Sequence, residues 1–581
     1  MTARERSAAD WQPWAVLALL AAATIALALV PQDDRSALPK RTAGTGEPLT
    51  AEQKSVEFRT ADLSLDIFPN RRAISGKAVL GFAVRKPIAK IQFDLDPELP
   101  IRAIAADGQA LNVKAWHNDG GFVTVELPRP KRAGDSLSLT VDYAGRPHVA
   151  KRAPWDGGFV WSRTKDGQPW IATAVEGEGC DLFWPCFDNS LVEVGQIDLH
   201  ITVPKGLSAP SNGRLLGVTE RPDGRRTFHW RTRNPNNYAI ALNIAPYKQL
   251  TAVHRSRFGN DVKMNYWYLP GEDDKAKALF AEFGPTLDTF EALVGPYPFG
   301  DEKLGVVETP HLGMEHQTIN AYGNAYKPSP EGFDWLFNHE FSHEWFGNQI
   351  TNRDWDDMWL HEGFGTYMQP LYLQQRGGEM LYHEALFKNR LTIANRFPVV
   401  SGTHRLEEQV YKPETGPGGD IYVKGAWVLH TLRGLIGDEA FFRSLRRLVY
   451  GRVDPAPGNF KPRFGSTNEF VAITSQESGR DLRWFFNAYL RHARLPKLIE
   501  TRQGRTLSLQ WQTPGGIPFP MPVDVRVDGR TMTVPMDKGR GAVSLPSDTS
   551  VWTVDPASKL LRQSDAIDRF RDWDKAQKKK P

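Results

Sequence analysis

The stretch NHEFSHEW, residues 338–345, contains residue types that hold a metal ion and activate a water molecule. His339 and His343 stand four positions apart. In a helix this spacing brings both imidazoles to one face, close enough to bind a single ion. Glu340 directly follows the first histidine, so its carboxylate is expected beside the ion, where a general base for a metal-bound water is needed. The alternative, a pair of surface histidines on an amphipathic helix, stays open on these eight residues alone.

A third metal ligand is available in WDDMWLHEGFGTYMQ, where Glu362 lies in a second helical segment. Catalytic zinc commonly has two histidines, one carboxylate and an open position for water. Eighteen residues separate His343 from Glu362, which is enough for the first helix to end and the second to return antiparallel. Trp359 and Phe364 make this segment apolar, and a carboxylate buried there needs a partner. An ordinary exposed glutamate is the alternative. A ligand set of His339, His343 and Glu362 predicts one Zn²⁺ per chain.

Length and composition bound the class of protein. A chain of 581 residues exceeds what one hydrophobic core supports, so several domains are expected. Hydrophobic residues at 40% and aromatic residues at 11% indicate a globular protein rather than a disordered one. The 72 basic and 68 acidic residues nearly balance, and no basic stripe with interleaved aromatics occurs, so nucleic-acid binding has no support. Cys180 and Cys186 are too few for a cysteine-ligated zinc site, and their spacing neither requires nor forbids a bond between them.

The N-terminal residues have the character of an export signal. Residues 14–30 form an uncharged apolar run, preceded by Arg4 and Arg6. The run resembles a secretory h-region or a short signal anchor, and its length is at the low end of what spans a bilayer. A buried core helix is the alternative, but residues 31–50 have linker composition and offer nothing to pack around it. We therefore expect an exported, periplasmic or membrane-anchored protein, with the catalytic domain outside the cytoplasm and any membrane attachment through residues 14–30.

Hydrophobic periodicity divides the chain into domains. After a signal and linker at 1–50, apolar and polar residues alternate through 51–251, with turns between the runs, which predicts an antiparallel β domain. The region 252–497 combines strand-like runs with helix-length segments, which predicts a mixed α/β catalytic domain with a helical lobe. Alternation returns at 498–565 and predicts a small β-sandwich, followed by a solvated charged tail at 566–581. The expected fold is thus multidomain α+β. The predicted helical segments are 273–294, 331–350, 357–375, 423–450 and 466–493.

The motif and its flanks carry a family resemblance. NHEFSHEWFGNQIT followed by WDDMWLHEGFGTYM resembles the zinc signature of the aminopeptidase N family of zinc metallopeptidases, the gluzincin aminopeptidases. Members carry H-E-x-x-H, then eighteen residues, then a glutamate, with the same WFGN and WLxEGF flanks as this chain. The resemblance implies a β domain, a thermolysin-like α/β catalytic domain and a small β-sandwich. It also implies that His339, His343 and Glu362 are zinc ligands and that Glu340 is the catalytic base.

The same resemblance implies residues that act on the oxyanion and on the substrate. Tyr422, in GGDIYVKGAWVLHTLR, matches the family's Y-x-K-G tyrosine, which donates a hydrogen bond to the developing oxyanion. Glu315, in HLGMEH, matches the glutamate of a G-x-M-E-N segment that binds the substrate's α-amine, and His316 replaces the usual asparagine. A second amine-binding glutamate precedes FPCFD-like segments. Glu176, in TAVEGEGCDLFWPCFD, takes that place, with Glu178 as the competing assignment.

These residues imply a zinc-dependent aminopeptidase that hydrolyses N-terminal residues from peptides through a metal-activated water. Two carboxylates around one ammonium group reject a blocked N-terminus, because the carboxylates are then left unpaired. An endopeptidase or epoxide hydrolase on the same scaffold is the alternative, and a non-catalytic peptide-binding or scaffold protein is another. A non-enzyme has no need of Glu340 and Tyr422 together. Many family members append a helical C-terminal domain, whereas this chain ends at residue 581, so we expect a more open cleft or one closed by a partner chain.

Overall fold

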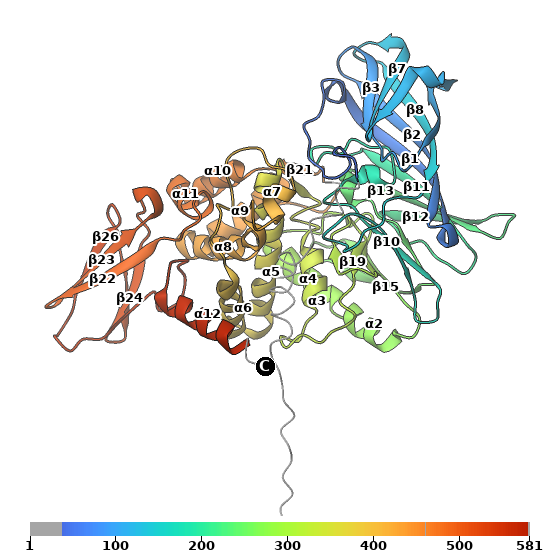
Figure 1. Ribbon diagram of the computed structural model, residues 1–581. Helices are drawn as coiled ribbons and strands as arrows, with labels where there is room; N and C mark the ends of the chain where they lie inside the picture. Colours follow the sequence, from blue (N-terminus) through green and yellow to red (C-terminus); the bar gives the residue numbers. More distant parts are fainter. Residues whose placement is uncertain (1–37, 459, 579–581) are drawn as a thin grey trace, which may run out of the picture.

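The computed structural model of the chain describes residues 38–458 and 460–578 (Figure 1). The apolar run predicted as an export signal, residues 14–30, lies outside these ranges. Among the helices of the described residues, none is long and apolar enough to cross a membrane. The N-terminal β domain and the small C-terminal sheets lie at opposite ends of the molecule, with the helices between them (Figure 1). The predicted multidomain α+β fold is confirmed.

The alternating residues of the N-terminal domain form a large sheet. In β1 (Val56–Phe68), Leu63 and Leu65 are buried while Asp62 and Ser64 are exposed, as expected for a sheet with one solvated face. The strands lie in the order β12 (Arg214–Glu220), β13 (Arg226–Arg233), β11 (Gln196–Val203), β1, β2 (Ala73–Val84), β8 (Ser136–Gly145), β4 (Ile101–Ala106) and β5 (Gln109–Ala110). One pair departs from the predicted antiparallel arrangement, because β1 and β11 run parallel. The long connection between them contains other strands, so no hairpin fixes their relative direction.

Two smaller sheets complete this domain and lead to a loop that matters for the site. Their strand orders are β3 (Ile88–Asp94), β7 (Phe122–Lys131), β6 (Trp116–Asp119), and β14 (Asn243–Ile244), β10 (Pro169–Ala174), β9 (Gly158–Arg163). The loop after β10 contains Glu176 and a disulfide between Cys180 and Cys186. A β-bridge between Asp94 and Cys186 fastens this loop to the end of β3. The disulfide therefore closes this loop on itself, and the bridge fastens its far end to the sheet.

The next domain begins with a mixed sheet. Its strand order is β15 (Lys248–Arg255), β16 (Asp261–Tyr268), β17 (Leu304–Glu308), β19 (Asn320–Tyr322) and β18 (Gly313–Met314). The domain boundary predicted at residue 251 falls inside β15, which pairs with β16 along its whole length. The predicted helix 273–294 is divided into α2 (Asp273–Phe280) and α3 (Phe283–Leu293). Because β18 lies at the end of the strand order, one of its edges is open to a further strand.

The helical lobe follows the predicted segments with shifted ends. Its elements are α4 (Trp335–Ser342), β20 (Ile350–Asn352), α5 (Trp359–Gly377), α6 (Glu379–Thr392), α7 (Glu408–Tyr411), α8 (Val423–Ile436), α9 (Asp438–Tyr450), β21 (Arg463–Gly465), α10 (Thr467–Ser478) and α11 (Arg483–Leu490). The segment predicted at 331–350 is helical only in α4, because the chain then turns into β20. The segment predicted at 423–450 breaks at Gly437, whose φ of 81° lies in the left-handed region that favours glycine.

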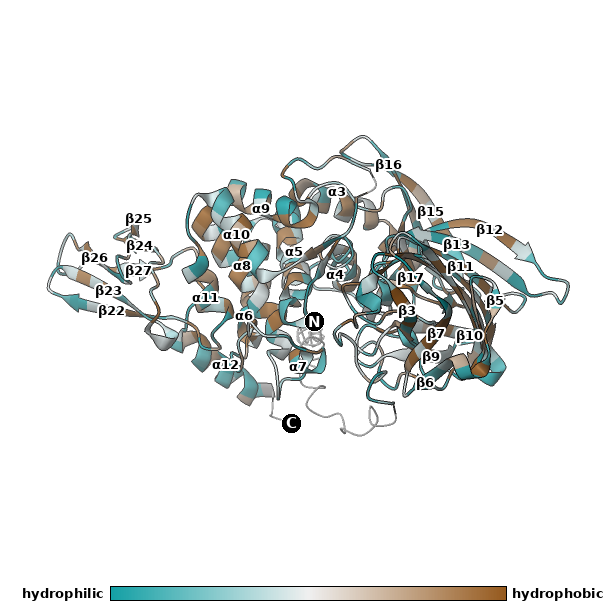
Figure 2. Ribbon diagram, turned by 90° about the horizontal axis from the view of Figure 1, so that it is seen from above, coloured by the Kyte–Doolittle hydropathy of each residue, from teal (hydrophilic) through white to brown (hydrophobic). Residues whose placement is uncertain are grey.

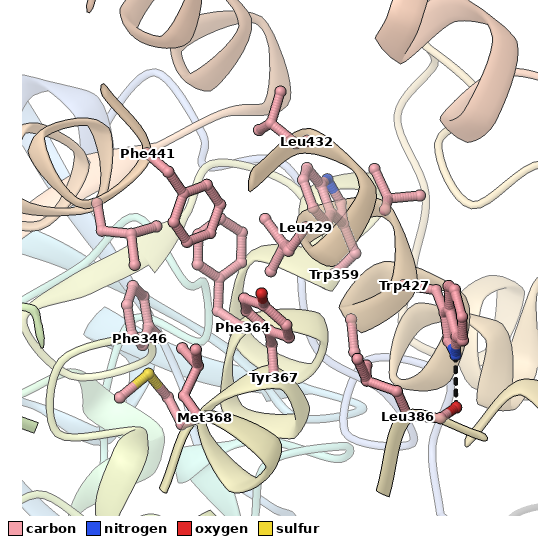
Figure 3. Close-up of a cluster of buried hydrophobic side chains, with 14 of the residues drawn as sticks. Phe346, Trp359, Phe364, Tyr367, Met368, Leu386, Trp427, Leu429, Leu432 and Phe441 are labelled. Atoms are coloured by element: carbon pink, nitrogen blue, oxygen red, sulfur yellow. Dashed lines mark hydrogen bonds between the residues drawn. The ribbon is translucent and has the colours of Figure 1, made fainter. Parts of the chain in front are cut away.

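The core of this lobe lies between α5, α8 and α9. Trp359, Phe364 and Tyr367 of α5 belong to one buried cluster with Leu429 of α8 and Phe441 of α9, and the Tyr367 and Phe441 rings lie 5.9 Å apart (Figure 3). Trp427 Nε1 donates a hydrogen bond of 2.7 Å to the carbonyl of Leu386 in α6, so the indole is buried without losing its polar partner (Figure 3). This packing fixes the start of α5, which carries the predicted third metal ligand.

The C-terminal region forms two small sheets and a final helix. The strand orders are β22 (Lys497–Gln503), β23 (Thr506–Gln512), β26 (Arg540–Ser544), and β25 (Arg530–Val534), β24 (Val523–Val527), β27 (Trp552–Val554). Leu507, Leu509 and Trp511 alternate into the core, as their spacing predicts. The residues predicted as a charged tail instead continue as α12 (Asp565–Lys578), where Arg571 donates to the carbonyl of Ile393. Figure 2 shows this helix as mostly hydrophilic, and both views place it beside α6.

Candidate active site

The three predicted metal ligands lie together at the junction of α4 and α5. His339 Nε2 and His343 Nε2 are 3.2 Å apart. Glu362 Oε2 is 3.4 Å from His339 Nε2 and 3.6 Å from His343 Nε2. Four tetrahedral ligands, each about 2.1 Å from a zinc ion, lie roughly 3.4 Å from one another. The donor atoms of this metal triad, His339, His343 and Glu362, therefore have the spacing that zinc requires.

The hydrogen bonding around the metal triad also fits a cation. Glu362 Oε2 is buried and has no hydrogen-bond partner among the described residues, which is costly for a carboxylate oxygen unless a positive charge faces it. His343 Nδ1 is 2.9 Å from the carbonyl of Phe346, so this nitrogen carries the proton and Nε2 keeps its lone pair. The Nε2 atom of His343 thus presents its lone pair toward the neighbouring donor atoms of the triad. The residues present fit a zinc ion.

The start of α4 is fixed by a buried N-cap. Asp334 Oδ1 accepts a hydrogen bond of 3.0 Å from the backbone N–H of Phe337. Its Oδ2 accepts from Tyr322 Oη at 2.6 Å and from Asn324 Nδ2 at 3.0 Å. An aspartate at this position satisfies one of the free N–H groups of the helix, and its second oxygen joins the helix to β19. The histidines one turn later are therefore held at a fixed distance from the sheet.

Glu340 lies beside the triad and is not one of its members. Its side chain is buried, and a Cβ at Gly313 would overlap its Oε1, so the glycine before Met314 makes room for this carboxylate. Burial raises the pKa of Glu340 well above its ordinary value, and the negative charges of Glu315 and Glu362 raise it further. A carboxylate with a raised pKa beside a metal site is suited to accept a proton.

A close glycine contact brings Tyr422 to Glu362. A Cβ on Gly425 would lie 2.9 Å from the Cα of Gly363, so α8 and α5 approach each other more closely than larger residues permit. Tyr422, directly before α8, donates a hydrogen bond of 3.0 Å from its Oη to Glu362 Oε1. The structure also places Tyr411 Oη 3.0 Å from the same oxygen. The sequence did not indicate Tyr411, which lies in the short helix α7 and belongs to no spacing pattern.

The two predicted amine-binding glutamates form a second cluster with His361. One side-chain atom from each of Glu176, Glu315 and His361 lies within 4.8 Å of the others. Glu315 Oε1 accepts a hydrogen bond of 2.7 Å from Tyr238 Oη. Burial and then the charge of Glu315 raise the pKa of Glu176 well above its ordinary value. Glu178, the competing assignment, instead packs against Gly157 and is not part of this cluster.

Of the residues around this second cluster, His361 could be located from the sequence motif and Tyr238 could not. His361 directly precedes Glu362, so its proximity to the site follows from the motif, whereas Tyr238 comes from the β domain and has no motif of its own.

His316, the departure from the family's asparagine, is completely buried. Burial and the neighbouring His311 lower its pKa to about 3, so its ring is neutral. It therefore adds no charge next to Glu315.

Comparison with known proteins agrees with this geometry. Residues 329–489 match the family model described as the peptidase family M1 domain, and residues 57–237 match the peptidase M1 N-terminal domain. Human aminopeptidase B is 26% identical over 409 residues, which cover 64% of this chain and 58% of that protein. Mouse endoplasmic reticulum aminopeptidase 1 is 23% identical over 478 residues, covering 77% of this chain and 48% of that protein. The chain thus spans about half the length of these curated relatives.

Solved structures match a larger share of their own length than these curated relatives do. An M1 zinc metallopeptidase from Deinococcus radiodurans, a mutant bound to a Tyr-Ser-Ala substrate, superimposes with a TM-score of 0.64 at 25% identity. The match covers 79% of this chain and 99% of that one. The non-mutant protein gives a TM-score of 0.62 at 26% identity. Both parts of the family match here in their order along the chain, with the zinc-binding motif inside the matched region, so the chain belongs to peptidase family M1, the aminopeptidase N family of zinc metallopeptidases.

Proposed function

We propose that the protein is a zinc-dependent aminopeptidase that hydrolyses the N-terminal residue from peptides. One observation carries the proposal: Glu176 and Glu315 bring carboxylate oxygens within 4.8 Å of each other, and the charge of Glu362 in the metal triad acts on the same Glu176. Two carboxylates this close repel each other unless a cation lies between them. The α-ammonium group of a peptide supplies that charge and leaves the first peptide bond beside the metal triad.

The chain's own residues divide the chemistry between them. His339, His343 and Glu362 would hold a zinc ion, which as a Lewis acid would polarise the scissile carbonyl and make a water molecule more acidic. Glu340 accepts the proton of the attacking water at its carboxylate and passes it to the amine nitrogen that leaves. Tyr422 Oη donates a hydrogen bond to the carbonyl oxygen as negative charge develops on it. The burial of Glu340 strengthens this proton transfer, because water does not compete for its carboxylate.

The substrate backbone has a place next to these groups. β18 (Gly313–Met314) is at the edge of its sheet, directly before Glu315. An extended peptide that pairs with this edge adds one strand and gains main-chain hydrogen bonds that are independent of its sequence. Its N-terminus then ends at Glu315 and Glu176, which explains why the enzyme acts at a chain end. An endopeptidase on this scaffold has no use for the two carboxylates, since no ammonium group reaches them.

A peptide and its N-acetylated twin test this proposal. We expect the free peptide to lose its first residue and the acetylated twin to react at least about 100-fold more slowly, because the neutral amide leaves two buried carboxylates unpaired. The measurement is the ratio of the two kcat/KM values, with a chelator-treated sample as the metal-free control. Equal cleavage of both peptides contradicts an aminopeptidase and favours an endopeptidase.

We further propose that the protein is exported or membrane-attached through residues 14–30, with the active site outside the cytoplasm. The apolar run at 14–30 and the disulfide between Cys180 and Cys186 support this independently, because disulfides persist in oxidising compartments. In a bacterial host we expect both thiols to resist labelling until a reductant is added, and the protein to leave the cytosolic fraction. Free thiols on cytosolic protein contradict the location.

A further inference from the structure

Residues 38–50, which the sequence predicts as linker, are folded onto the β domain, and we refer to them as the N-terminal strap. Thr42 is completely buried and contacts Gly121 in the turn before β7. Arg41 Nε donates a hydrogen bond of 2.6 Å to Asp94 Oδ1, and its guanidinium lies 4.6 Å from the ring centroid of Phe122. The strap is therefore held by both apolar and charged contacts.

Charge explains why the strap stays in place. Asp94, Asp181 and Asp188 are all buried near Arg41. Burial and then the charge of Asp94 raise the pKa of Asp188 to about 8, and the charge of Arg41 lowers it. Asp181 has no hydrogen-bond partner for either carboxylate oxygen among the described residues. If the strap detached, these carboxylates would lose the guanidinium that compensates their charge, which costs far more than a surface ion pair.

The strap touches the loop that carries Glu176. The backbone N–H of Thr45 donates a hydrogen bond of 3.2 Å to the carbonyl of Gly177, the residue directly after Glu176. Thr45 Oγ1 donates to Asp188 Oδ1 at 2.8 Å. Thr45, Glu176 and His361 line the same cavity of about 20 Å³, which is room for one water molecule. Because glycines follow Glu176 at alternate positions, this loop has little stiffness of its own.

The strap also reaches the catalytic domain. A Cβ on Gly46 would lie 2.7 Å from the indole of Trp355, so only glycine permits this approach. The ring of Trp355 lies 6.0 Å from that of Tyr411, which donates to the metal ligand Glu362. The carbonyl of Glu47 accepts a hydrogen bond of 2.9 Å from Asn189 Nδ2. The strap thus contacts both the loop that carries Glu176 in the β domain and Trp355, which packs against Tyr411, in the catalytic domain.

We propose that the N-terminal strap is part of the substrate-binding site, and that Thr45 is a positioning residue that holds Glu176 against the α-ammonium group of the peptide. This inference rests on the proposed aminopeptidase function. Thr45 does not touch the reacting atoms. It fixes the backbone one residue beyond Glu176, and a carboxylate displaced from an ammonium group by a small distance loses much of the attraction.

The test compares Thr45→Val with Thr45→Ser in the full chain. Valine keeps the β-branched shape but removes the hydroxyl, whereas serine keeps the hydroxyl. For a peptide with a free N-terminus, we expect Thr45→Val to raise KM about tenfold with kcat within about twofold of wild type. Thr45→Ser is expected to restore KM. Thr531→Val, on an exposed position of β25, is the matched control and is expected to change neither value. Zinc content is expected to stay at one per chain.

Failure of the strap inference and failure of the proposed function give different results. The function fails on wild-type protein alone, when free and acetylated peptides react equally. The strap inference fails when wild type discriminates between the two peptides and Thr45→Val has an unchanged KM. Calorimetric binding of leucine amide reads the ammonium site without turnover, and an unchanged Kd in Thr45→Val likewise overturns the inference. If that variant does not fold, Gly46→Ala is used instead, because it displaces the strap from Trp355. A Kd and KM equal to those of wild type in Gly46→Ala then overturn the inference.

Discussion

Glu340→Gln is expected to lower kcat by about 10³-fold while the protein still binds one zinc ion per chain. Glutamine has the shape of glutamate and keeps the packing against Gly313, but it does not accept a proton from water. Glu340 is not one of the three proposed zinc ligands His339, His343 and Glu362, so the substitution leaves their donor atoms unchanged. Steady-state kinetics gives kcat, and metal analysis of the same preparation gives the zinc content.

Glu344→Gln is the matched control for this loss. Glu344 lies one turn further along and is also buried, but its Oε1 accepts hydrogen bonds from the backbone N–H of Thr318 at 2.8 Å and from Asn320 Nδ2 at 3.1 Å. These hydrogen bonds come from the loop and strand before α4 rather than from the metal triad, so the amide removes no group from the proposed chemistry. We expect kcat to stay within a few-fold of wild type. Turnover that survives in Glu340→Gln, or zinc that is lost from it, contradicts the assigned role.

The metal triad was predictable from the sequence because its geometry is local. Helical periodicity brings residues four apart to one face, so His339 and His343 needed no knowledge of the fold. Glu362 needed only that a second helix return antiparallel, which the intervening turn residues indicated. The structure brings the three donor atoms to 3.2 to 3.6 Å from one another. The predicted start of the first helix at residue 331 was too early, because the N-cap is Asp334.

The remaining parts of the site depend on contacts that leave no periodic pattern. Tyr238 reaches Glu315 from another domain, and Tyr411 reaches Glu362 from a short helix. Glu176 lies with Glu315 and His361 while Glu178 does not, and this follows from the path of a loop that one sequence does not specify. The strap itself has linker composition, and its contacts with distant residues, among them the buried aspartates around Arg41, explain why it is ordered. Residues that act through tertiary contacts with distant segments carry no signal in one sequence.

Helix ends were missed for a related reason. Periodicity continues through 331–350, yet α4 ends at Ser342 because the chain must turn to pair β20 with β21. The two histidines therefore lie at the very end of a helix rather than at its centre. This position leaves the His343 imidazole next to the carbonyl of Phe346, which fixes its tautomer. An uninterrupted helix would have used that carbonyl in its own hydrogen bonds.

Tyr422→Phe and Tyr411→Phe form the second decisive experiment. Each tyrosine donates to Glu362 Oε1 at 3.0 Å, so each substitution removes one hydroxyl and one hydrogen bond of equal length to the same ligand. Their surroundings differ. The Tyr422 ring lies 6.2 Å from that of the metal ligand His339, whereas Tyr411 packs at 6.0 Å against Trp355. Tyr422 is therefore the one that we propose to donate to the carbonyl oxygen of a substrate beside the metal triad.

We expect Tyr422→Phe to lower kcat by about 10²- to 10³-fold with little change in KM, because an oxyanion donor acts mainly in the transition state. Tyr411→Phe is expected to lower kcat by less than about tenfold, the effect of losing one hydrogen bond to a ligand. Measuring kcat, KM and zinc content for both variants separates loss of the oxyanion donor from loss of support for Glu362. If the two variants lose equal activity, the common bond to Glu362 explains both effects and the oxyanion role fails. If Tyr411→Phe loses more, that role belongs to the tyrosine that the sequence did not indicate.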